Sequence, residues 1–172
     1  MTWCIRIPRA MIDEIRADLR RPHAFAAERV GFVLARAGNQ AGGEWLILPQ
    51  SYQGVADDYY IDNPKVGATI SSSAIRSVMQ TILQQELTAL HVHVHEHMGR
   101  PRFSRVDLAN YPALVSSFRN VAPRLAHGAL LLSDNSCDAL VWLPGFDGPL
   151  AGGRIVVVGR PTEFFDGGAL YA

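Results

Sequence analysis

Residues 91–107 read His-Val-His-Val-His-Glu-His-Met-Gly-Arg-Pro-Arg-Phe-Ser-Arg-Val-Asp and hold four of the six histidines in the chain. These histidines stand at every second position. Alternate residues of a β-strand point to the same face of a sheet, so the spacing predicts a strand whose imidazoles share one face. Leu90, Val92 and Val94 occupy the other positions and predict an apolar opposite face. A row of imidazoles followed by the carboxylate of Asp107 is typical of a metal site.

Histidines in a row also occur in strands that hold no metal. An edge strand can carry solvated or pH-sensing imidazoles, and a His-rich patch can bind metal weakly without being a built site. A buried imidazole row is costly without partners, which favours a divalent cation such as zinc. The histidines alone leave these interpretations open.

A second motif lies far upstream, in Ala27-Glu28-Arg29-Val30-Gly31-Phe32-Val33-Leu34, where a glutamate opens an apolar run with strand character. Together with His93-Val94-His95 and Ser104-Arg105-Val106-Asp107, this segment resembles the motif of the JAMM (JAB/MPN) zinc metalloproteases. The family pattern is a Glu on a strand, then His-x-His, a short loop and Ser-x-x-Asp. The resemblance covers roughly residues 3–143, and the short chain is similar to stand-alone prokaryotic JAB domains of the deubiquitinase-like type.

The motif departs from the family pattern after its second histidine. His95 is followed by Glu96, where the family has proline, and it stands twelve residues before Asp107, one more than the family spacing. Gly99 and Pro101 make the intervening segment turn-prone, so the loop can absorb one extra residue.

The departure leaves more than one histidine pair open. His93 with His95 fits the family spacing best, and the alternatives are His95 with His97 and His91 with His93. If His93 and His95 are the ligands, we expect His91 and His97 to support the ligands, to lie on the substrate side or to be exposed.

The resemblance implies a role for each residue of the motif. His93, His95 and Asp107 would bind Zn²⁺ and leave a fourth position for water. Glu28 would act as the general base, and Ser104 would donate a hydrogen bond to the developing oxyanion. On its own, Glu28 would be taken as a solvent-facing side chain. Ser104 also stands where an N-cap belongs, and the two roles are compatible.

The composition is compatible with a compact enzyme but does not by itself indicate one. The chain has 172 residues, with 16 Lys+Arg balancing 16 Asp+Glu. This balance gives no reason to expect a nucleic-acid partner. Cys4 and Cys137 form neither a CxxC motif nor a disulfide framework. The amino terminus lacks the apolar core of a signal peptide, and no apolar stretch is long enough to span a membrane. We therefore expect one domain over residues 1–172, in the cytoplasm, with no membrane partner.

Periodicity predicts alternating strands and helices. Helices are expected at 10–19, with Pro8 before it as a first helical residue, and at 71–85 and 104–121. Strands are expected at 3–7, 30–36, 44–49, 90–95, 128–132, 139–143 and 154–158. The segment 51–63 is less readable and is interpreted as a strand with a loop. This order predicts an α/β fold with a mixed β-sheet sandwiched by helices. It is similar to the MPN (cytidine-deaminase-like) fold, although periodicity alone permits other α/β architectures.

The resemblance implies hydrolysis of a peptide or isopeptide bond at the carboxyl-terminal end of a ubiquitin-like protein. The implied partners are that protein or its conjugate, together with ubiquitin-activating-enzyme-like and conjugating-enzyme-like proteins. An alternative is a catalytically inactive MPN-like scaffold or interaction module. A cupin-like iron oxygenase would be nearly all β, and the metallo-β-lactamase pattern His-x-His-x-Asp-His is not met.

Overall fold

The computed structural model describes residues 1–24, 26–63 and 67–168, and its centre is a mixed sheet of eight strands. The strands are β1 (Thr2–Pro8), β2 (Val30–Asn39), β3 (Glu44–Gly54), β4 (Thr88–Val94), β5 (His127–Leu132), β6 (Cys137–Trp142), β7 (Gly153–Val158) and β8 (Glu163–Gly167). Their order in the sheet is β6-β5-β4-β2-β3-β1-β7-β8. β1 runs parallel to β3 and β7, and β4 runs parallel to β5, while the other neighbours are antiparallel.

The two edges of this sheet approach each other. The backbone N–H of Gly168, just after β8, donates to the carbonyl of Ala139 in β6 at 2.9 Å. The N–H of Leu150 donates to the carbonyl of Val141 in the same strand, also at 2.9 Å. These contacts cover part of the edge that β6 would otherwise expose, so the sheet is nearly closed.

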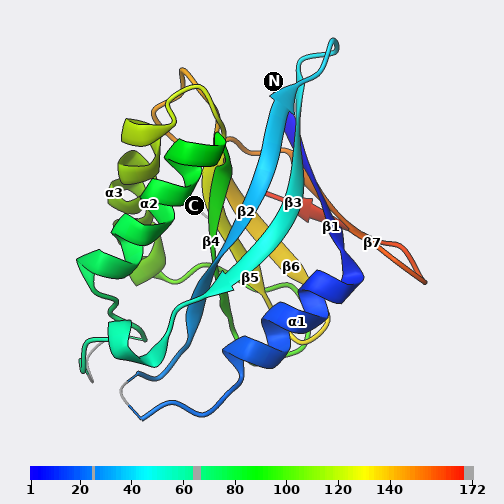
Figure 1. Cartoon of the computed structure of the whole chain (residues 1–172). Helices are drawn as coiled ribbons and strands as arrows, with labels where there is room; N and C mark the ends of the chain where they lie inside the picture. The colour runs from blue at the N-terminus through cyan, green and yellow to red at the C-terminus, as the bar shows by residue number, and fades with distance from the viewer. Residues whose placement is uncertain (25, 64–66, 169–172) are drawn as a thin grey trace.

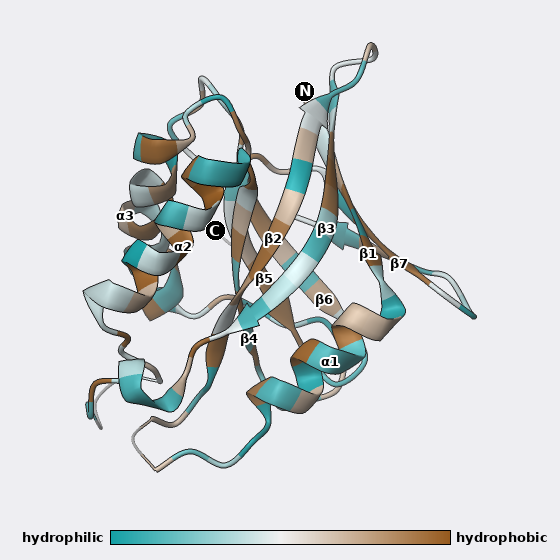
Figure 2. Ribbon diagram, in the orientation of Figure 1, coloured by the Kyte–Doolittle hydropathy of each residue, from teal (hydrophilic) through white to brown (hydrophobic). Residues whose placement is uncertain are grey.

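Three α-helices within the described residues cover the sheet. α1 (Arg9–Leu19) lies on one face, and α2 (Ser72–Gln85) and α3 (Arg105–Val121) lie side by side on the other (Figure 1). A short 3-10 turn, η1 (Asp57–Tyr59), follows β3. The helices are striped in polar and apolar colours (Figure 2), as expected for helices that bury one side. Their buried residues are Ile12, Ile15 and Leu19 in α1, Ala74, Val78 and Ile82 in α2, and Tyr111, Val115 and Phe118 in α3.

The predicted α/β class, the mixed sheet and the three helices are confirmed, with three differences. β8 is not predicted, because its five residues carry no strong alternation and gain their order from pairing with β7. β3 continues past the predicted end at residue 49 to Gly54, so the strand expected in the segment 51–63 is part of β3 and is followed by the 3-10 turn. Pro8 is the N-cap residue of α1 rather than its first helical residue. No helix in the described ranges is long and apolar enough to cross a membrane.

Candidate metal centre

β4 separates its side chains as the alternating pattern predicts. Leu90, Val92 and Val94 belong to the apolar core that also contains the buried residues of α1. The imidazoles lie on the opposite face, beneath α2 and α3. The ring centroids of His91 and His93 are 6.0 Å apart, and those of His93 and His95 are 4.9 Å apart. The histidine row is therefore a continuous cluster on one side of the strand.

Strand pairing brings Glu28 to this cluster. β2 and β4 are antiparallel, with Val30 opposite His93. Continuing that register by two residues sets Glu28 opposite His95, although Glu28 itself lies just before β2 begins. The carboxylate of Glu28 and the ring nitrogens of His93 and His95 offer ligand atoms that all lie within 4.8 Å of one another. Residues that are distant in the sequence thus form one polar group.

The backbone of Glu28 is fixed by a hydrogen bond to the segment before α2. Its N–H donates to the carbonyl of Gly67 at 2.9 Å. A Cβ atom at Gly67 would lie 2.7 Å from Oε1 of Glu28, closer than real contacts allow. Glycine at this position therefore leaves the carboxylate room to occupy its place in the cluster.

The residue after Glu28 anchors the same stretch of chain. The Arg29 side chain is 3% exposed, and its guanidinium pairs with Asp57 at 2.8 Å. It also donates to the carbonyls of Arg21 at 2.9 Å and Pro22 at 3.2 Å. This satisfied, buried charge ties the approach to β2 to the 3-10 turn.

Asp107 reaches the cluster from the first turn of α3. Its Oδ2 lies 3.6 Å from Nε2 of His93. The same oxygen accepts a hydrogen bond from the N–H of Ser104 at 2.7 Å, and the Ser104 hydroxyl accepts one from the N–H of Asp107 at 3.1 Å. This reciprocal capping box begins the helix and orients the carboxylate. Ser104 is therefore the N-cap, which is one of the two roles expected for it.

Nε2 of His93 is buried and makes no hydrogen bond with the part of the chain that the structure describes. At 3.6 Å, the Asp107 carboxylate is too far away to supply a good one. Two ligand atoms of a tetrahedral zinc, each about 2.0–2.1 Å from the metal, lie roughly 3.3 Å apart. The His93–Asp107 separation is close to that value, so these two atoms fit a shared zinc ion, whereas the group of ligand atoms within 4.8 Å of one another consists of Glu28, His93 and His95 and does not include Asp107.

The other nitrogen of His93 is held by a tyrosine. The Tyr111 hydroxyl lies 3.0 Å from Nδ1 of His93 and 3.1 Å from Nδ1 of His91. A phenol has one hydrogen, so it can donate to only one of the two rings and accepts from the other. Donation to His91 leaves Nδ1 of His93 as the protonated nitrogen and puts the lone pair of His93 on Nε2. That is the tautomer a metal ligand needs.

Burial and the proximity of neighbouring side chains shift the pKa values of several groups in the cluster. Burial, together with the neighbouring His93, lowers the pKa of His91 to about 3. The same two causes, in the same order, lower the pKa of His95. Burial alone would raise the pKa of Asp107, but His93 and the donors of Ser104 outweigh it and hold the pKa below its usual value. Burial raises the pKa of Tyr111 well above its usual value, so the phenol keeps its hydrogen. The site therefore combines the neutral imidazoles of His91 and His95 with the ionised carboxylate of Asp107.

The loop that follows His95 is held by the turn between β5 and β6. The N–H of His95 donates to the carbonyl of Leu132 at 2.9 Å. Asp134 donates its N–H to the carbonyl of His97 at 3.0 Å. The N–H of Gly99 donates to the Asn135 side chain at 2.7 Å. These bonds fix the start of the loop that leads to Ser104.

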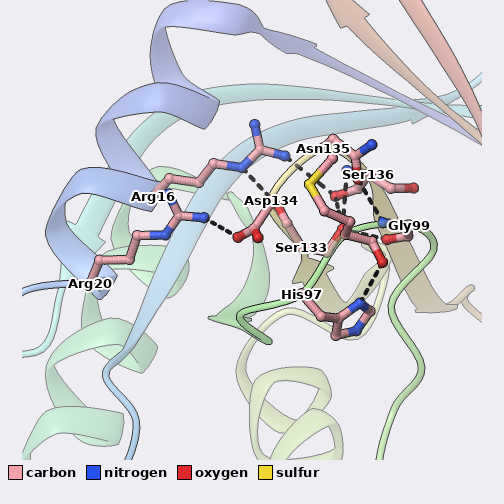
Figure 3. Close-up of polar contacts among 9 residues, drawn as sticks. Arg16, Arg20, His97, Gly99, Ser133, Asp134, Asn135 and Ser136 are labelled. Atoms are coloured by element: carbon pink, nitrogen blue, oxygen red, sulfur yellow. Dashed lines mark hydrogen bonds and ion pairs between the residues drawn. The ribbon is translucent and has the colours of Figure 1, made fainter.

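α1 holds that turn from the other side (Figure 3). The guanidinium of Arg16 donates to the carbonyl of Ser133 at 3.0 Å and to that of Ser136 at 3.4 Å. Arg20 forms an ion pair with Asp134. The chain of contacts runs from α1 through residues 133–136 to the loop after His95, so the helix on one face supports the site on the other.

A cavity of about 590 Å³ opens onto the cluster. Glu28, His93, Ser104 and Asp107 line its polar end, and His91 and Tyr111 also border it. His97 is exposed, and its Nδ1 lies 2.9 Å from the carbonyl of Met98. The structure thus groups His93 and His95 with Glu28, sets Asp107 beside His93, and leaves His97 outside. Tyr111 is not predicted from the sequence, although it lies four residues after Asp107 and hence on the same side of the helix.

No protein-family model matches the chain, and no curated protein sequence is significantly similar to it.

Proposed function

We propose that this chain is a zinc-dependent metallopeptidase or isopeptidase with an MPN-like fold. The observation that carries the proposal is the joint placement of Glu28, His93 and His95 within 4.8 Å, beside a cavity and the carboxylate of Asp107. The unpartnered Nε2 of His93 supports a metal at this point. A closed structural site would have no need of an adjoining cavity.

His93, His95 and Asp107 would hold the zinc. Bound there, zinc would lower the pKa of a coordinated water to about 7 and polarise a carbonyl. Tyr111 would hold His93 in the required tautomer, and the capping box would hold Asp107. These supporting contacts keep two of the three ligands in place before any metal arrives.

Glu28 would act as the general base. Its carboxylate would accept a proton from the attacking water and return it to the leaving amine. The spacing within 4.8 Å also fits Glu28 as a direct ligand. Metal retention after replacement of Glu28 by Gln distinguishes the two roles, because a base is dispensable for binding and a ligand is not.

Ser104 would stabilise the oxyanion. Capping uses a lone pair of its oxygen to accept the N–H of Asp107 at 3.1 Å. The hydroxyl hydrogen is not consumed by that bond and can be donated to substrate. The cap and the oxyanion donor are therefore two simultaneous uses of one side chain. A preorganised donor of this kind contributes roughly 3–4 kcal/mol in a well-formed site.

The substrate proposed from the motif is the carboxyl-terminal end of a ubiquitin-like protein or its conjugate. The proposed partners are that protein and enzymes resembling ubiquitin-activating and ubiquitin-conjugating enzymes. The setting proposed for the reaction is the cytoplasm. Nothing in the charge balance adds a nucleic-acid partner to this proposal.

The test compares wild type with Glu28→Gln in two assays. Elemental analysis measures bound zinc, and cleavage is followed with a ubiquitin-like protein fused to a reporter through a Gly-Gly end. We expect both proteins to hold zinc and cleavage to fall by about 10²–10⁴-fold in the variant. Equal cleavage by the two proteins would refute the role of Glu28. Zinc binding by wild type without cleavage of any peptide or isopeptide bond would favour the inactive scaffold.

A further inference from the structure

The cavity beside the metal cluster has an apolar half that the proposed chemistry does not use. Its inner wall is formed by aliphatic side chains from β2, α2, α3 and the segment before α2. These are Val30, Ala68, Ile70, Ile75 and Leu114. The polar residues Glu28, His93 and Asp107 lie together at the candidate metal centre and form what we call the polar end, and Thr69 and Asn110 also line the cavity. An apolar recess with a few polar groups converging at one end is the usual form of a ligand site.

The size of the cavity restricts what can fill it. Its volume is about 590 Å³, within the range of roughly 300–1,000 Å³ typical of small-molecule sites. A glycine has no side chain to place there. A substrate that ends in glycines would engage the polar end and leave the aliphatic wall in contact with water, which is unfavourable.

The wall stays open because small residues stand where larger ones would close it. Ala27, Gly67 and Ala68 are among the lining residues, and Gly67 lies against the Glu28 carboxylate. Tyr111 also lines the cavity, and its hydroxyl lies 3.1 Å from Nδ1 of His91 and 3.0 Å from Nδ1 of His93. The cavity lining therefore places small and aliphatic residues together with the polar residues of the candidate metal centre.

The geometry points to a specificity pocket that receives a large apolar side chain from the substrate residue on one side of the scissile bond. This inference rests on the proposed metallopeptidase function and narrows its substrate class. A leucine or phenylalanine side chain would lie against Ile75 and Leu114 while the scissile carbonyl lies at the polar end. A glycine on the other side of the bond remains compatible with this arrangement.

The experiment uses two hydroxamates that share a zinc-binding group and differ in apolar size. Acetohydroxamate and 3-phenylpropanohydroxamate are titrated into the zinc-loaded protein by calorimetry. Each buried methylene contributes a factor of about four in affinity, so we expect the phenyl compound to bind at least about 100-fold more tightly. Equal affinities would overturn the inference.

A matched pair of variants locates the effect. Ala68→Phe places a ring inside the cavity and should reduce the ratio of the two affinities to within about tenfold. Ala17→Phe makes the same change at an exposed position of α1, on the other face of the sheet, and should leave the ratio unchanged. A ratio unaffected by Ala68→Phe would place the apolar contact elsewhere and contradict the proposal.

A metal-free arm separates this inference from the proposed function. If the protein takes up no zinc, the metallopeptidase proposal fails. The pocket is then tested with 3-phenylpropanamide, which has no chelating group, by backbone amide NMR. Shift changes at Ala68, Ile75 and Leu114 that Ala68→Phe abolishes would support the apolar pocket. The absence of shifts at millimolar ligand would overturn it.

Discussion

The phenol oxygen of Tyr111 lies 3.0 Å from Nδ1 of His93, on the side of the imidazole opposite the unpartnered Nε2. The buried phenol keeps its hydrogen, and when it donates that hydrogen to His91 it accepts the N–H of His93 Nδ1, which leaves the lone pair of His93 on Nε2. We predict that Tyr111→Phe weakens zinc binding by about 10–100-fold, the usual loss when a group supporting a ligand is removed. Competition with a chelating dye measures this affinity.

The substitution retains the tyrosine ring and its edge contact with Phe103, whose centroid lies 5.6 Å away. The fold should therefore persist, and unchanged circular dichroism checks this. Tyr59→Phe is the matched control, since Tyr59 is 41% exposed and is not among the residues that line the cavity. An affinity in Tyr111→Phe equal to that of the control would show that the hydroxyl does not support the ligand.

Gly67 gives a way to move the Glu28 carboxylate without removing it. The Cβ of Gly67→Ala would meet Oε1 of Glu28 at 2.7 Å and displace the end of that side chain. A displacement of about 1 Å costs roughly 100-fold in a positioned reaction. We predict a fall in hydrolysis of about that size, with zinc content unchanged.

The control for Gly67→Ala is Gly38→Ala, where an added Cβ meets nothing within 4 Å. Both changes reduce the flexibility of the unfolded chain, so their difference isolates the contact with Glu28. Full activity in Gly67→Ala, measured by initial rates, would mean that the position of the carboxylate is not critical.

Arg16 should contribute to stability through the turn that it supports. Its guanidinium donates to the carbonyls of Ser133 and Ser136, and these bonds cross from α1 to the β5–β6 turn. Hydrogen bonds from charged groups are worth about 1.5–3 kcal/mol. Arg16→Met keeps the aliphatic stem, and we predict a loss of about 2 kcal/mol in the free energy of unfolding by urea. Arg6→Met, at an exposed position of β1, should change it by less than about 0.5 kcal/mol. Equal losses of unfolding free energy in the two variants would show that the hydrogen bonds of Arg16 to the β5–β6 turn do not stabilise the fold.

The burial of His127 predicts that the fold loses stability in acid. It is fully buried, its Nδ1 accepts the N–H of Ala89 at 3.1 Å, and its Nε2 lies 3.0 Å from the carbonyl of Ala122. Burial lowers its pKa from 6.5 to about 4. The unfolded chain therefore binds the proton more readily, and the contribution of neutral His127 is complete above pH 6.5 and is lost as the pH falls toward 4.

The expected loss attributable to this group is about 3 kcal/mol between pH 7 and pH 4. Urea unfolding in the presence of a chelator measures it without interference from bound metal. In His127→Gln, the decline in stability over this window should be smaller by about that amount. An identical pH profile for wild type and variant would show that His127 does not titrate with unfolding.

Much of the fold follows from local sequence patterns, because its strands and helices have regular apolar spacing. Alternation in β4 separates Val92 from His91 and His93, and the structure keeps that separation. β8 is not predicted from local patterns, because its order depends on pairing with β7. The helix cap at Ser104 is local and is expected from the sequence.

The parts of the site that depend on distant segments are harder to predict. No periodicity sets Glu28 against His95; the β2–β4 register does so, and only the resemblance to a known motif suggests it beforehand. The roles of Gly67 and Tyr111 depend on how their segments pack over the sheet. The cavity likewise depends on how α2, α3 and residues 67–70 pack over the sheet. The spacing of residues in the sequence does not specify this packing.

We propose that His93 and His95, rather than His95 and His97, hold one zinc ion. The most direct test is elemental analysis of wild type, His93→Ala and His97→Ala after purification in buffer containing limiting zinc. We predict one zinc per chain in wild type and His97→Ala, and much less in His93→Ala. Loss of zinc from His97→Ala with retention by His93→Ala, or no zinc in wild type, would contradict the account.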